Sequence, residues 1–402
     1  MKKLPFLFCL IQSAVCALLP LVSCATGQGG LSLRAVRDIQ ADEYFNAPSD
    51  FLIYYDPSSE SEKQSAFAAL SEVKSYVKDV ERALSAERDG DVANFNQAKA
   101  GEKISLSQTA YHAFTAAQEL YTETDGAFNP AVRLSVDLWG FSPRFFSEDY
   151  RPTAVYDRED FKSNPPDEKY VTAFRSLSNF GKIELSEENG DYYAVKPDDT
   201  VTVDGISYSM QIDLGSFGKG YAADGARDIL VSYGIEYGYV SLGGSSISLL
   251  KYPKENTGSG IPYDWRVQIT YPEKERAASG EWFAYTGAKD CGISTSGDYE
   301  RYYEQNGVRY CHIIDTATGA PVQTEICSAF AICPSAASAD AYTTALMAMG
   351  EEKATSFLRQ LSKKNIPAAL TLRTATGYRT LTNGDGFQLN SAYAGTFSLE
   401  RI

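Results

Sequence analysis

A glycine-rich turn followed by an amphipathic segment is the sequence feature that most constrains how this chain can fold. The apolar end of Ile212-Asp213-Leu214 leads into Gly215-Ser216-Phe217-Gly218-Lys219-Gly220. After this run, apolar residues recur at helical spacing until Gly234 ends the pattern. The apolar residues are Ala222, Ala226, Ile229, Leu230 and Tyr233. The order predicts a strand, a tight turn and a helix, so sheet and helix belong to one body.

Apolar periodicity predicts further helices and strands. Segments 64–84 and 106–120 carry apolar side chains at helical spacing. These are Phe67, Leu70, Val73, Val77, Val80 and Leu84, and then Leu106, Ala110, Phe114, Ala117 and Leu120. Strands are predicted at Phe51–Tyr55, at Tyr239–Leu242, in the run up to Leu250, and on both sides of Asn306-Gly307, a strong hairpin signal. No linker or repeat divides residues 49–402, so we expect a single α+β domain.

The N-terminus has the pattern of an export signal. Lys2 and Lys3 precede an apolar run over residues 4–21, and small residues stand before Cys24. This pattern predicts a lipoprotein signal peptide over residues 1–23, lipidation of Cys24, and a flexible tether over residues 24–48. The protein would then sit at the extracytoplasmic face of a bacterial membrane. The alternative is an uncleaved transmembrane helix, but polar residues and a proline interrupt the apolar run.

The charge of the chain limits its partners. The formal net charge is −15, and removal of residues 1–23 takes away two lysines and leaves −17. Such a surface repels nucleic acid. An anionic ligand would therefore have to be neutralised locally, by a metal ion, a lysine or backbone amides.

Four cysteines follow Cys24 in the sequence. They are Cys291, Cys311, Cys327 and Cys333, with no CxxC pair and no spacing that suggests zinc. Export permits disulfides, yet a chain of this length can bury a sufficient core without them. Their disulfide state stays open, and core positions are the simplest interpretation.

Residues 141–170 are predicted to form a surface insertion. The segment is rich in Pro, Ser, Asp and aromatic residues, and Asn164-Pro165-Pro166 breaks any regular element. Its aromatic residues could cover the active site or a partner, or the segment could be an irregular solvated loop. The sequence does not choose between these interpretations.

The turn at residues 215–220 has the properties of a phosphate-binding site. Glycines let the backbone approach a ligand, amides at a helix start attract phosphate oxygens, and Lys219 adds a positive charge. Gly243-Gly244 opens a second glycine turn, and both turns could line one ligand. The simpler interpretation is that tight turns use glycine for conformational reasons alone.

Two constellations near the C-terminal half predict chemistry. His312 lies near the end of a predicted strand and is followed by Asp315, where catalytic groups often gather; a structural histidine is the alternative. Asp340 and Thr344 share one face of an alanine-rich helix predicted to be capped near Ser335. One carboxylate and one hydroxyl suit Mg²⁺ completed by substrate phosphates, although Thr344 could instead bond to its own backbone. His112, in contrast, falls off the apolar stripe of its helix and is expected at the surface.

Seven ordered motifs resemble the FAD:protein FMN transferases, the ApbE-like flavin transferases. They are Thr124-Asp125-Gly126-Ala127-Phe128-Asn129-Pro130, Leu138-Trp139-Gly140-Phe141, 213–221, Leu242-Gly243-Gly244, Thr295-Ser296-Gly297-Asp298, 312–319 and 340–344. The resemblance spans most of the chain after residue 23. It implies an ApbE-like α+β fold, with a largely antiparallel or mixed sheet flanked by helices.

The resemblance also implies roles for individual residues. The metal ligands would be Asp340, Thr344 and the carbonyl of Gly218, and His312 would act near the scissile diphosphate. A further hypothesis is that His312 accepts the proton of the attacking hydroxyl, oriented by Asp315 or Asp298. The FAD contacts would be Ala127, Phe128, Asn129, Gly215, Lys219, Tyr221, Gly243, Gly244, Thr295, Ser296 and Ile313. The chain departs from the family pattern at Asn129, Ser245 and Thr316, where Asp, Asn or Asp, and Pro are usual. No Met-Gly-Thr strand start is present around residues 46–53.

The implied activity is transfer of FMN from FAD to a serine or threonine hydroxyl of an exported acceptor protein, with release of AMP. Acceptors would be flavoprotein subunits of electron-transfer or ion-pumping complexes. Two alternatives remain at this point: a Mg²⁺-dependent FAD pyrophosphatase that gives FMN and AMP, and a noncatalytic FAD-binding lipoprotein. The acceptor's identity and the oligomeric state are left open.

Overall fold

The computed structural model describes residues 33–87, 89–142, 165–253 and 264–402. The predicted signal peptide, Cys24 and most of the predicted insertion over residues 141–170 lie outside the described residues. Within the described part, no helix has both the length and the apolar character needed to cross a membrane.

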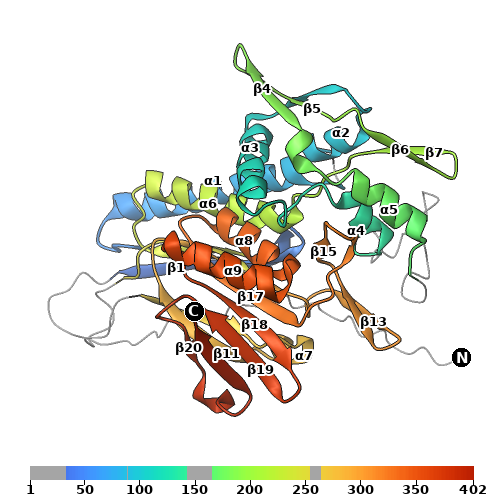
Figure 1. Ribbon diagram of the computed structural model, residues 1–402. Coiled ribbons are helices and arrows are strands. Elements are labelled where there is room, and N and C mark those ends of the chain that lie inside the picture. Colours follow the sequence, from blue (N-terminus) through green and yellow to red (C-terminus); the bar gives the residue numbers. More distant parts are fainter. Residues whose placement is uncertain (1–32, 88, 143–164, 254–263) are drawn as a thin grey trace, which may run out of the picture.

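A mixed sheet forms the centre of the fold (Figure 1). Within the described residues it has nine strands in the order β1-β2-β8-β9-β12-β17-β18-β19-β21, and all neighbours are antiparallel except β19 and β21. The strands are β1 (Arg34–Tyr44), β2 (Ala47–Tyr55), β8 (Gly238–Leu242), β9 (Ser246–Leu249), β12 (Gly292–Gly297), β17 (Ile326–Cys333), β18 (Ala368–Thr374), β19 (Gly377–Thr382) and β21 (Phe397–Arg401). The predicted α+β class with a mixed sheet is confirmed.

A layer of helices covers one face of the sheet. It consists of α1 (Glu60–Leu84), α6 (Gly215–Ser232), α8 (Ala336–Ala348) and α9 (Gly350–Lys363). Leu70, Val73, Val77 and Val80 of α1 are buried against this core, as the helical spacing predicts. Phe67 is the exception, because it is 52% exposed and lies outside the buried stripe that Ala66, Ala69 and Leu70 form.

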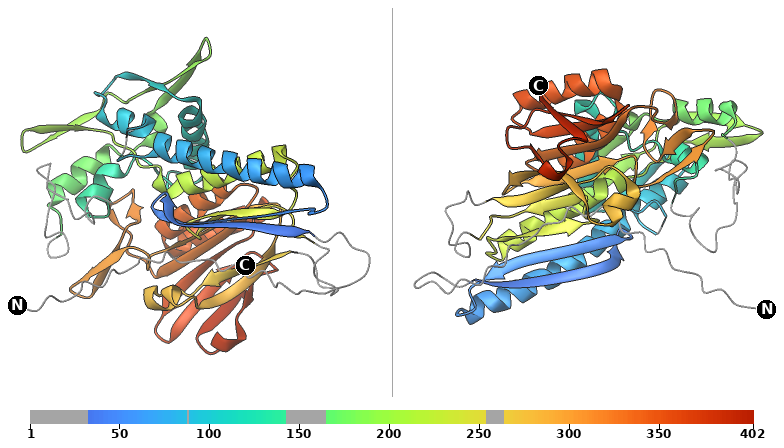
Figure 2. Two further views of the ribbon diagram at one scale, coloured as in Figure 1. Left: turned by 180° about the vertical axis from the view of Figure 1, so that it is seen from behind. Right: turned by 90° about the horizontal axis from the view of Figure 1, so that it is seen from below.

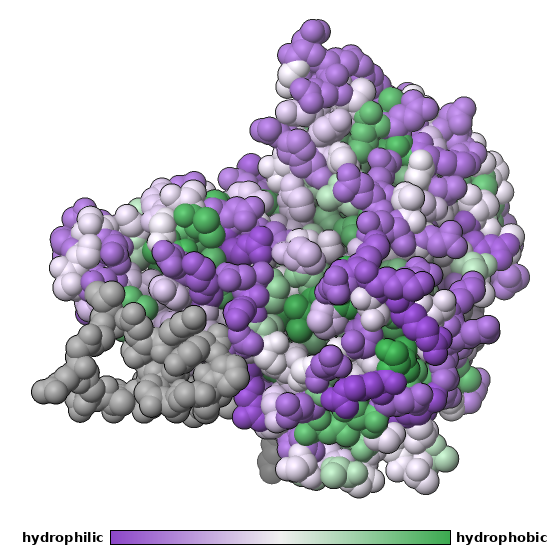
Figure 3. Space-filling view, turned by 60° about the vertical axis from the view of Figure 1, so that its left-hand side comes forward, coloured by the Kyte–Doolittle hydropathy of each residue, from purple (hydrophilic) through white to green (hydrophobic). Residues whose placement is uncertain are grey.

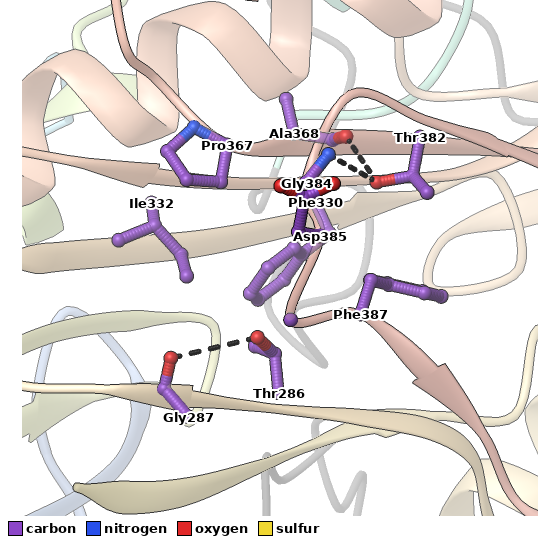
Figure 4. A pocket seen from close by; sticks show the side chains of 11 residues that line it. Thr286, Gly287, Phe330, Ile332, Pro367, Ala368, Thr382, Gly384, Asp385 and Phe387 are labelled. Atoms are coloured by element: carbon purple, nitrogen blue, oxygen red, sulfur yellow. Dashed lines mark hydrogen bonds between the residues drawn. The ribbon is translucent and has the colours of Figure 1, made fainter. Parts of the chain in front are cut away.

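A smaller sheet packs on the opposite face of the central sheet. It contains β10 (Trp265–Thr270), β11 (Trp282–Ala288) and β20 (Gln388–Leu389), and α7 (Lys274–Ala278) joins its first two strands. A small cavity of about 110 Å³ lies between β11 and the strands β17 and β18, with Phe330, Ile332 and Phe387 in its lining (Figure 4). Its lining is apolar for the most part, so it belongs to the second core rather than to a polar site.

The remaining elements form a lobe beside the helical layer (Figure 2). They are α2 (Asp91–Gln97), β3 (Lys103–Leu106), α3 (Gln108–Glu123), α4 (Arg133–Leu138), α5 (Glu168–Ser176), η2 (Phe180–Lys182), β4 (Glu184–Glu188), β5 (Asp191–Val195), β6 (Thr200–Val203) and β7 (Ile206–Ser209). The short pairs β13 (Tyr302–Gln305) with β14 (Val308–Cys311), and β15 (Ile314–Asp315) with β16 (Ala320–Pro321), lie next to α4 and α5. A short 3-10 helix, η4 (Ser391–Tyr393), precedes β21.

Three sequence predictions need correction. Residues 34–44 form the edge strand β1, paired with β2, and not part of a flexible tether. Phe141 and Tyr170, at the ends of the predicted insertion, are buried beside α4 and α5. Residues 212–214 form no strand, since β7 ends at Ser209 and α6 begins at Gly215. In each case tertiary packing, which local patterns do not encode, decides the outcome.

The visible surface is mostly polar. The face shown in Figure 3 is largely hydrophilic, and hydrophobic side chains occupy separate small areas. His112 is exposed on α3, as predicted, and its ring packs edge-on against Tyr111 at a centroid distance of 5.7 Å.

Lys196 is a buried cation whose side chain caps the C-terminal end of helix α2. Its Nζ donates to the carbonyls of Phe95, Asn96 and Ala98 at 3.1, 3.0 and 2.9 Å. We expect Lys196→Met to lower the free energy of unfolding by about 1–3 kcal/mol, because buried carbonyls lose their donor. Denaturant unfolding measures this difference. Lys182→Met, which removes an exposed ion pair with Asp199, is the matched control and is expected to change stability far less.

Candidate active site

Asp340 is the buried carboxylate around which the site is arranged. It lies in the second turn of α8, whose N-cap Ser335 accepts a hydrogen bond from the backbone N–H of Ser338, as the sequence predicts. Asp340 accepts from the backbone N–H of Gly220 at 2.8 Å and from the Ser246 hydroxyl at 2.8 Å. Burial raises the pKa of Asp340 to about 7, although these hydrogen bonds and Lys219 act in the opposite direction.

Helices α6 and α8 approach closely at this carboxylate. A Cβ on Gly220 would lie 2.4 Å from the carbonyl oxygen of Ala336, so only glycine fits at this crossing. Asp224, one turn further along α6, accepts from the backbone N–H groups of Ala336 and Ala337 at 2.8 and 2.9 Å. Asp224 therefore anchors the first residues of α8 to α6. This contact fixes the position of Asp340 relative to α6.

Removal of the Asp224 carboxylate should disturb the site as well as the fold. We expect Asp224→Ala to lower the free energy of unfolding by about 1–3 kcal/mol, because two N–H groups at the start of α8 lose their acceptor. The binding of Mg²⁺ that the sequence predicts at Asp340 should become weaker as well. Asp228→Ala makes the same chemical change at an exposed position of α6 and is expected to alter neither quantity. Thermal unfolding and ligand titration measure the two effects, and equal behaviour of both variants would contradict the assignment.

The two predicted glycine turns do meet in space. Gly243, with φ of 69°, lies in the turn between β8 and β9, and a Cβ there would be 3.3 Å from Lys219 Nζ. Lys219 runs past this turn, and its Nζ donates to the Ser245 hydroxyl at 3.3 Å. One amide of the expected phosphate cradle is already engaged, because the N–H of Gly215 donates to the Asp213 carboxylate at 2.7 Å. The cationic group of Lys219 thus remains the main attraction for an anion at this turn.

Hydroxyl groups line α8 and the adjacent strand β12. Thr343 is fully buried and donates to the carbonyl of Ala339 at 3.0 Å, while the Ser296 hydroxyl donates to Thr343 at 2.9 Å. Back-bonding, the alternative considered for Thr344, is therefore found at Thr343 instead. Thr344 is half-buried, and within the described part of the chain its hydroxyl makes no hydrogen bond.

His312 lies at the base of the β13–β14 hairpin, directly after β14. The predicted hairpin is present, and Asn306 and Gly307 have the positive φ angles of its tight turn. The backbone N–H of His312 donates to the carbonyl of Arg301 at 3.1 Å, and Nδ1 lies 3.3 Å from the same oxygen. A hydrogen on Nδ1 would leave Nε2 as the proton acceptor. Burial lowers the pKa of His312 well below its usual range, and the charges of Arg301 and Lys219 add to this effect.

Neither predicted carboxylate orients His312. Asp298 accepts two hydrogen bonds from the Arg373 guanidinium, at 2.6 and 2.7 Å. Asp315 accepts from the N–H of Ala317 at 2.8 Å and from the Thr318 hydroxyl at 3.1 Å, which closes its own turn. The orienting role predicted for Asp298 and Asp315 is therefore corrected, and the carbonyl of Arg301 takes their place.

Several predicted FAD contacts are unavailable as side chains. Phe128 is fully buried and packs on Phe217 at a centroid distance of 6.1 Å. Asn129 donates to the carbonyl of Ser178 and accepts from the N–H of Ala131. Ile313 and Thr295 are also buried. Core packing and local hydrogen bonds engage these four side chains, so backbone atoms are the groups that they offer most readily to a ligand. Gly215 is exposed, and Ala127, Tyr221 and Ser296 are half-buried.

The structure adds residues that sequence reasoning missed. Ser246 and Ser294 donate to Asp340, and Glu300 and Arg301 lie close enough to Lys219 or His312 to influence their charges. Burial raises the pKa of Glu300, against the charges of Lys219 and Arg301. Their positions in the sequence could have indicated these residues. Ser246 follows the second glycine turn, and Glu300-Arg301 follows the motif at residues 295–298.

All four cysteines beyond Cys24 are buried free thiols. Burial raises the pKa of Cys291, Cys311 and Cys327 to about 12. The core interpretation is therefore correct, and the open question of disulfides is answered for the described residues.

Comparisons with known proteins identify the family of this chain. A family model, the ApbE family, matches residues 51–370 of the chain. The FAD:protein FMN transferase of Treponema pallidum is 31% identical over 296 residues, which cover 73% of this chain and 74% of that protein. The FAD:protein FMN transferase of Escherichia coli K12 is 30% identical over 276 residues, 68% of each chain.

Solved structures show the same fold. A mutant of the flavin transferase ApbE from Vibrio cholerae aligns with a TM-score of 0.65 at 25% identity, over 90% of this chain and 98% of that one. The family model covers well over half of the sequence, and the identity to relatives reaches 31%. On these grounds the chain belongs to the ApbE family.

Proposed function

We propose that this protein is an FAD:protein FMN transferase, which moves FMN from FAD to a serine or threonine hydroxyl of an acceptor protein and releases AMP. The proposal is supported by Lys219 of α6, which directly precedes Gly220, whose N–H donates to Asp340 of α8. The charge of Lys219 acts on both Asp340 and His312, which follows the β13–β14 hairpin. The family relationship supports the same reaction, because the relatives are named FAD:protein FMN transferases.

Mg²⁺ fits the donor set of this site. The described residues contain no cluster of three or more His, Cys, Asp or Glu that could hold a metal ion by itself. Asp340, the free hydroxyl of Thr344 and the carbonyl of Gly218 would hold the ion, and hard oxygen donors of this kind suit Mg²⁺ completed by phosphate. A cation would also favour the ionised form of a carboxylate whose pKa is raised to about 7 by burial. When bound, the ion supplies charge neutralisation at the diphosphate.

The protein's own groups account for the proton and the charge. Lys219, whose Nζ reaches the second glycine turn, would offset negative charge on the diphosphate in a chain of net charge −15. His312 is neutral near pH 7, and Nε2 would take the proton of the acceptor hydroxyl. The hydroxyl oxygen forms a bond to the FMN phosphorus, the bond from that phosphorus to the bridging oxygen breaks, and AMP leaves with that oxygen.

Incubation of the protein with FAD, Mg²⁺ and candidate acceptor domains tests the proposal. Transfer predicts a fluorescent flavin band on the denatured acceptor and one AMP per flavin attached. AMP and free FMN without a labelled acceptor would identify a pyrophosphatase, in which water replaces the hydroxyl. FAD binding without AMP release would identify a noncatalytic flavin carrier, and either result would overturn the proposal.

We also propose that the protein is exported and anchored by lipid at Cys24, where it meets exported electron-transfer or ion-pumping flavoproteins. The support is the sequence pattern over residues 1–24. Expression of Cys24→Ala in a bacterium that acylates lipoproteins should move the protein from the membrane fraction to the soluble fraction. Ser23→Ala keeps the small residue before the cysteine and serves as control. An unchanged membrane fraction for Cys24→Ala would contradict the anchor.

A further inference from the structure

Four aromatic rings form a continuous stack between the segment 139–141 and the β13–β14 hairpin. Tyr303 and Tyr310 are cross-strand partners whose ring centroids lie 5.3 Å apart at an interplanar angle of 21°. Trp139 stacks on Tyr310 at 5.5 Å and 20°, and Phe141 stacks on Tyr303 at 5.5 Å and 22°. Each stacked pair of rings contributes about 0.5–1.5 kcal/mol beyond its area burial, so the stack fixes the hairpin against the end of α4.

Trp139 makes a second contact on the other side of His312. Its indole Nε1–H donates to the carbonyl of Gly319 at 3.0 Å. Gly319 closes the turn after β15 and packs against α5, since a Cβ there would lie 3.1 Å from the carbonyl oxygen of Val171. Trp139 therefore contacts the chain two residues before His312, through Tyr310, and again seven residues after it.

His312 depends on these contacts because its own are few. It lies between β14 and β15, outside both strands. Both of its hydrogen bonds go to the carbonyl of Arg301, and the bond from the ring is long, at 3.3 Å. Within the described residues no carboxylate contacts the imidazole. The position of Nε2 is therefore set by the path of the backbone through residues 311–315, and less by bonds of the ring itself.

We propose that Trp139 and Tyr310 are positioning residues that fix the backbone on both sides of His312 and thereby hold its Nε2 in place for proton transfer. The proposal rests on the proposed function only for the reaction that Nε2 serves. A displacement of a catalytic group by about 1 Å lowers a rate by about 10²-fold, which sets the size of the expected effect.

Kinetic variants separate positioning from general stability. Tyr310→Leu removes the central ring of the stack, whereas Tyr310→Phe keeps it and is the matched control. Trp139→Phe keeps a ring on Tyr310 but loses the N–H donor to Gly319. We expect Tyr310→Leu and Trp139→Phe to lower kcat for FMN transfer with KM for FAD unchanged, and Tyr310→Phe to retain the wild-type rate. A loss confined to KM would overturn the proposal.

A double-mutant cycle tests whether the effect passes through His312. If it does, Tyr310→Leu lowers the rate of the wild-type protein but has no further effect on His312→Ala. An equal proportional loss in both backgrounds would show that the stack acts elsewhere and would overturn the proposal.

Nitrogen NMR of the imidazole gives a readout independent of activity. The chain has two histidines, so His112→Gln leaves the signals of His312 alone. We expect one dominant tautomer, with hydrogen on Nδ1, in the background protein and in Tyr310→Phe, and mixed tautomers in Tyr310→Leu and Trp139→Phe, all recorded well below the thermal midpoint of each protein. If these two variants show mixed tautomers but the wild-type protein transfers no FMN, the positioning role is supported and the proposed function is contradicted. Identical tautomer ratios in all four proteins would overturn the positioning role.

Discussion

Replacement of His312 by alanine is expected to abolish FMN transfer while FAD still binds. The imidazole is half-buried, its pKa is lowered by burial, and Nδ1 faces the carbonyl of Arg301, so Nε2 is a free acceptor near neutral pH. Loss of a positioned general base lowers a rate by about 10²- to 10⁴-fold. Flavin attached to the acceptor measures the rate, and quenching of flavin fluorescence measures FAD affinity.

His112→Ala is the matched control for this variant. His112 is the second histidine of the chain, exposed on α3 with its ring against Tyr111. We expect it to transfer FMN at the wild-type rate. Full activity of His312→Ala, or an equal loss in both variants, would remove His312 from the mechanism.

Asp340→Asn is expected to remove Mg²⁺-dependent FAD binding and to lower the transfer rate by at least about 10²-fold. The asparagine keeps an oxygen for the N–H of Gly220 but carries no charge for a cation. Loss of charge stabilisation at a metal site amounts to several kcal/mol, and each 1.36 kcal/mol corresponds to a factor of ten in rate. The metal-free protein should remain folded, because the variant also removes a carboxylate whose ionisation burial disfavours.

Thermal unfolding distinguishes a lost ligand from a lost fold. Mg²⁺ together with FAD should raise the thermal midpoint of the wild-type protein, since bound ligand stabilises the folded state by mass action. Asp340→Asn should show the same midpoint with and without Mg²⁺, and Thr344→Val a reduced increase. Asp228→Asn removes an exposed carboxylate from α6 and should behave as the wild type. A normal Mg²⁺ response of Asp340→Asn would contradict the metal assignment.

The parts of the fold that local patterns encode were predictable from the sequence. The buried stripe of α1, the Asn306-Gly307 turn and the Ser335 cap each depend on residues a few positions apart. Strand β1 was missed because its sequence, RAVRDIQADEY, is polar and charged. Such a strand forms at the edge of a sheet because β2 pairs with it from Arg34 to Gln40 and again at Tyr44, and no local pattern reveals that partner.

The motifs that carry the candidate site were predictable from the sequence. The hydrogen-bond partners of their side chains were less predictable. Lys219 lies within electrostatic reach of both Asp340 and His312, and the glycine turns meet as expected. The prediction that Asp298 orients His312 was wrong, because Asp298 pairs with Arg373, 75 positions further along the chain. A pairing of that kind depends on how β18 lies beside β17, which sequence spacing does not give. The burial of Phe128 was not predictable, because a motif does not distinguish residues that touch a ligand from residues that support the site.

The reactivity of the four buried thiols reports local opening of the structure. Each reacts with an alkylating reagent only when water reaches it, because burial keeps the thiolate scarce. Cys311 ends β14 beside His312, whereas Cys327 lies inside the central strand β17. Alkylation followed by mass spectrometry would therefore record how often the hairpin detaches while the central sheet stays closed. The rate at which the β13–β14 hairpin opens could be measured in this way with the natural thiols and no engineered cysteine.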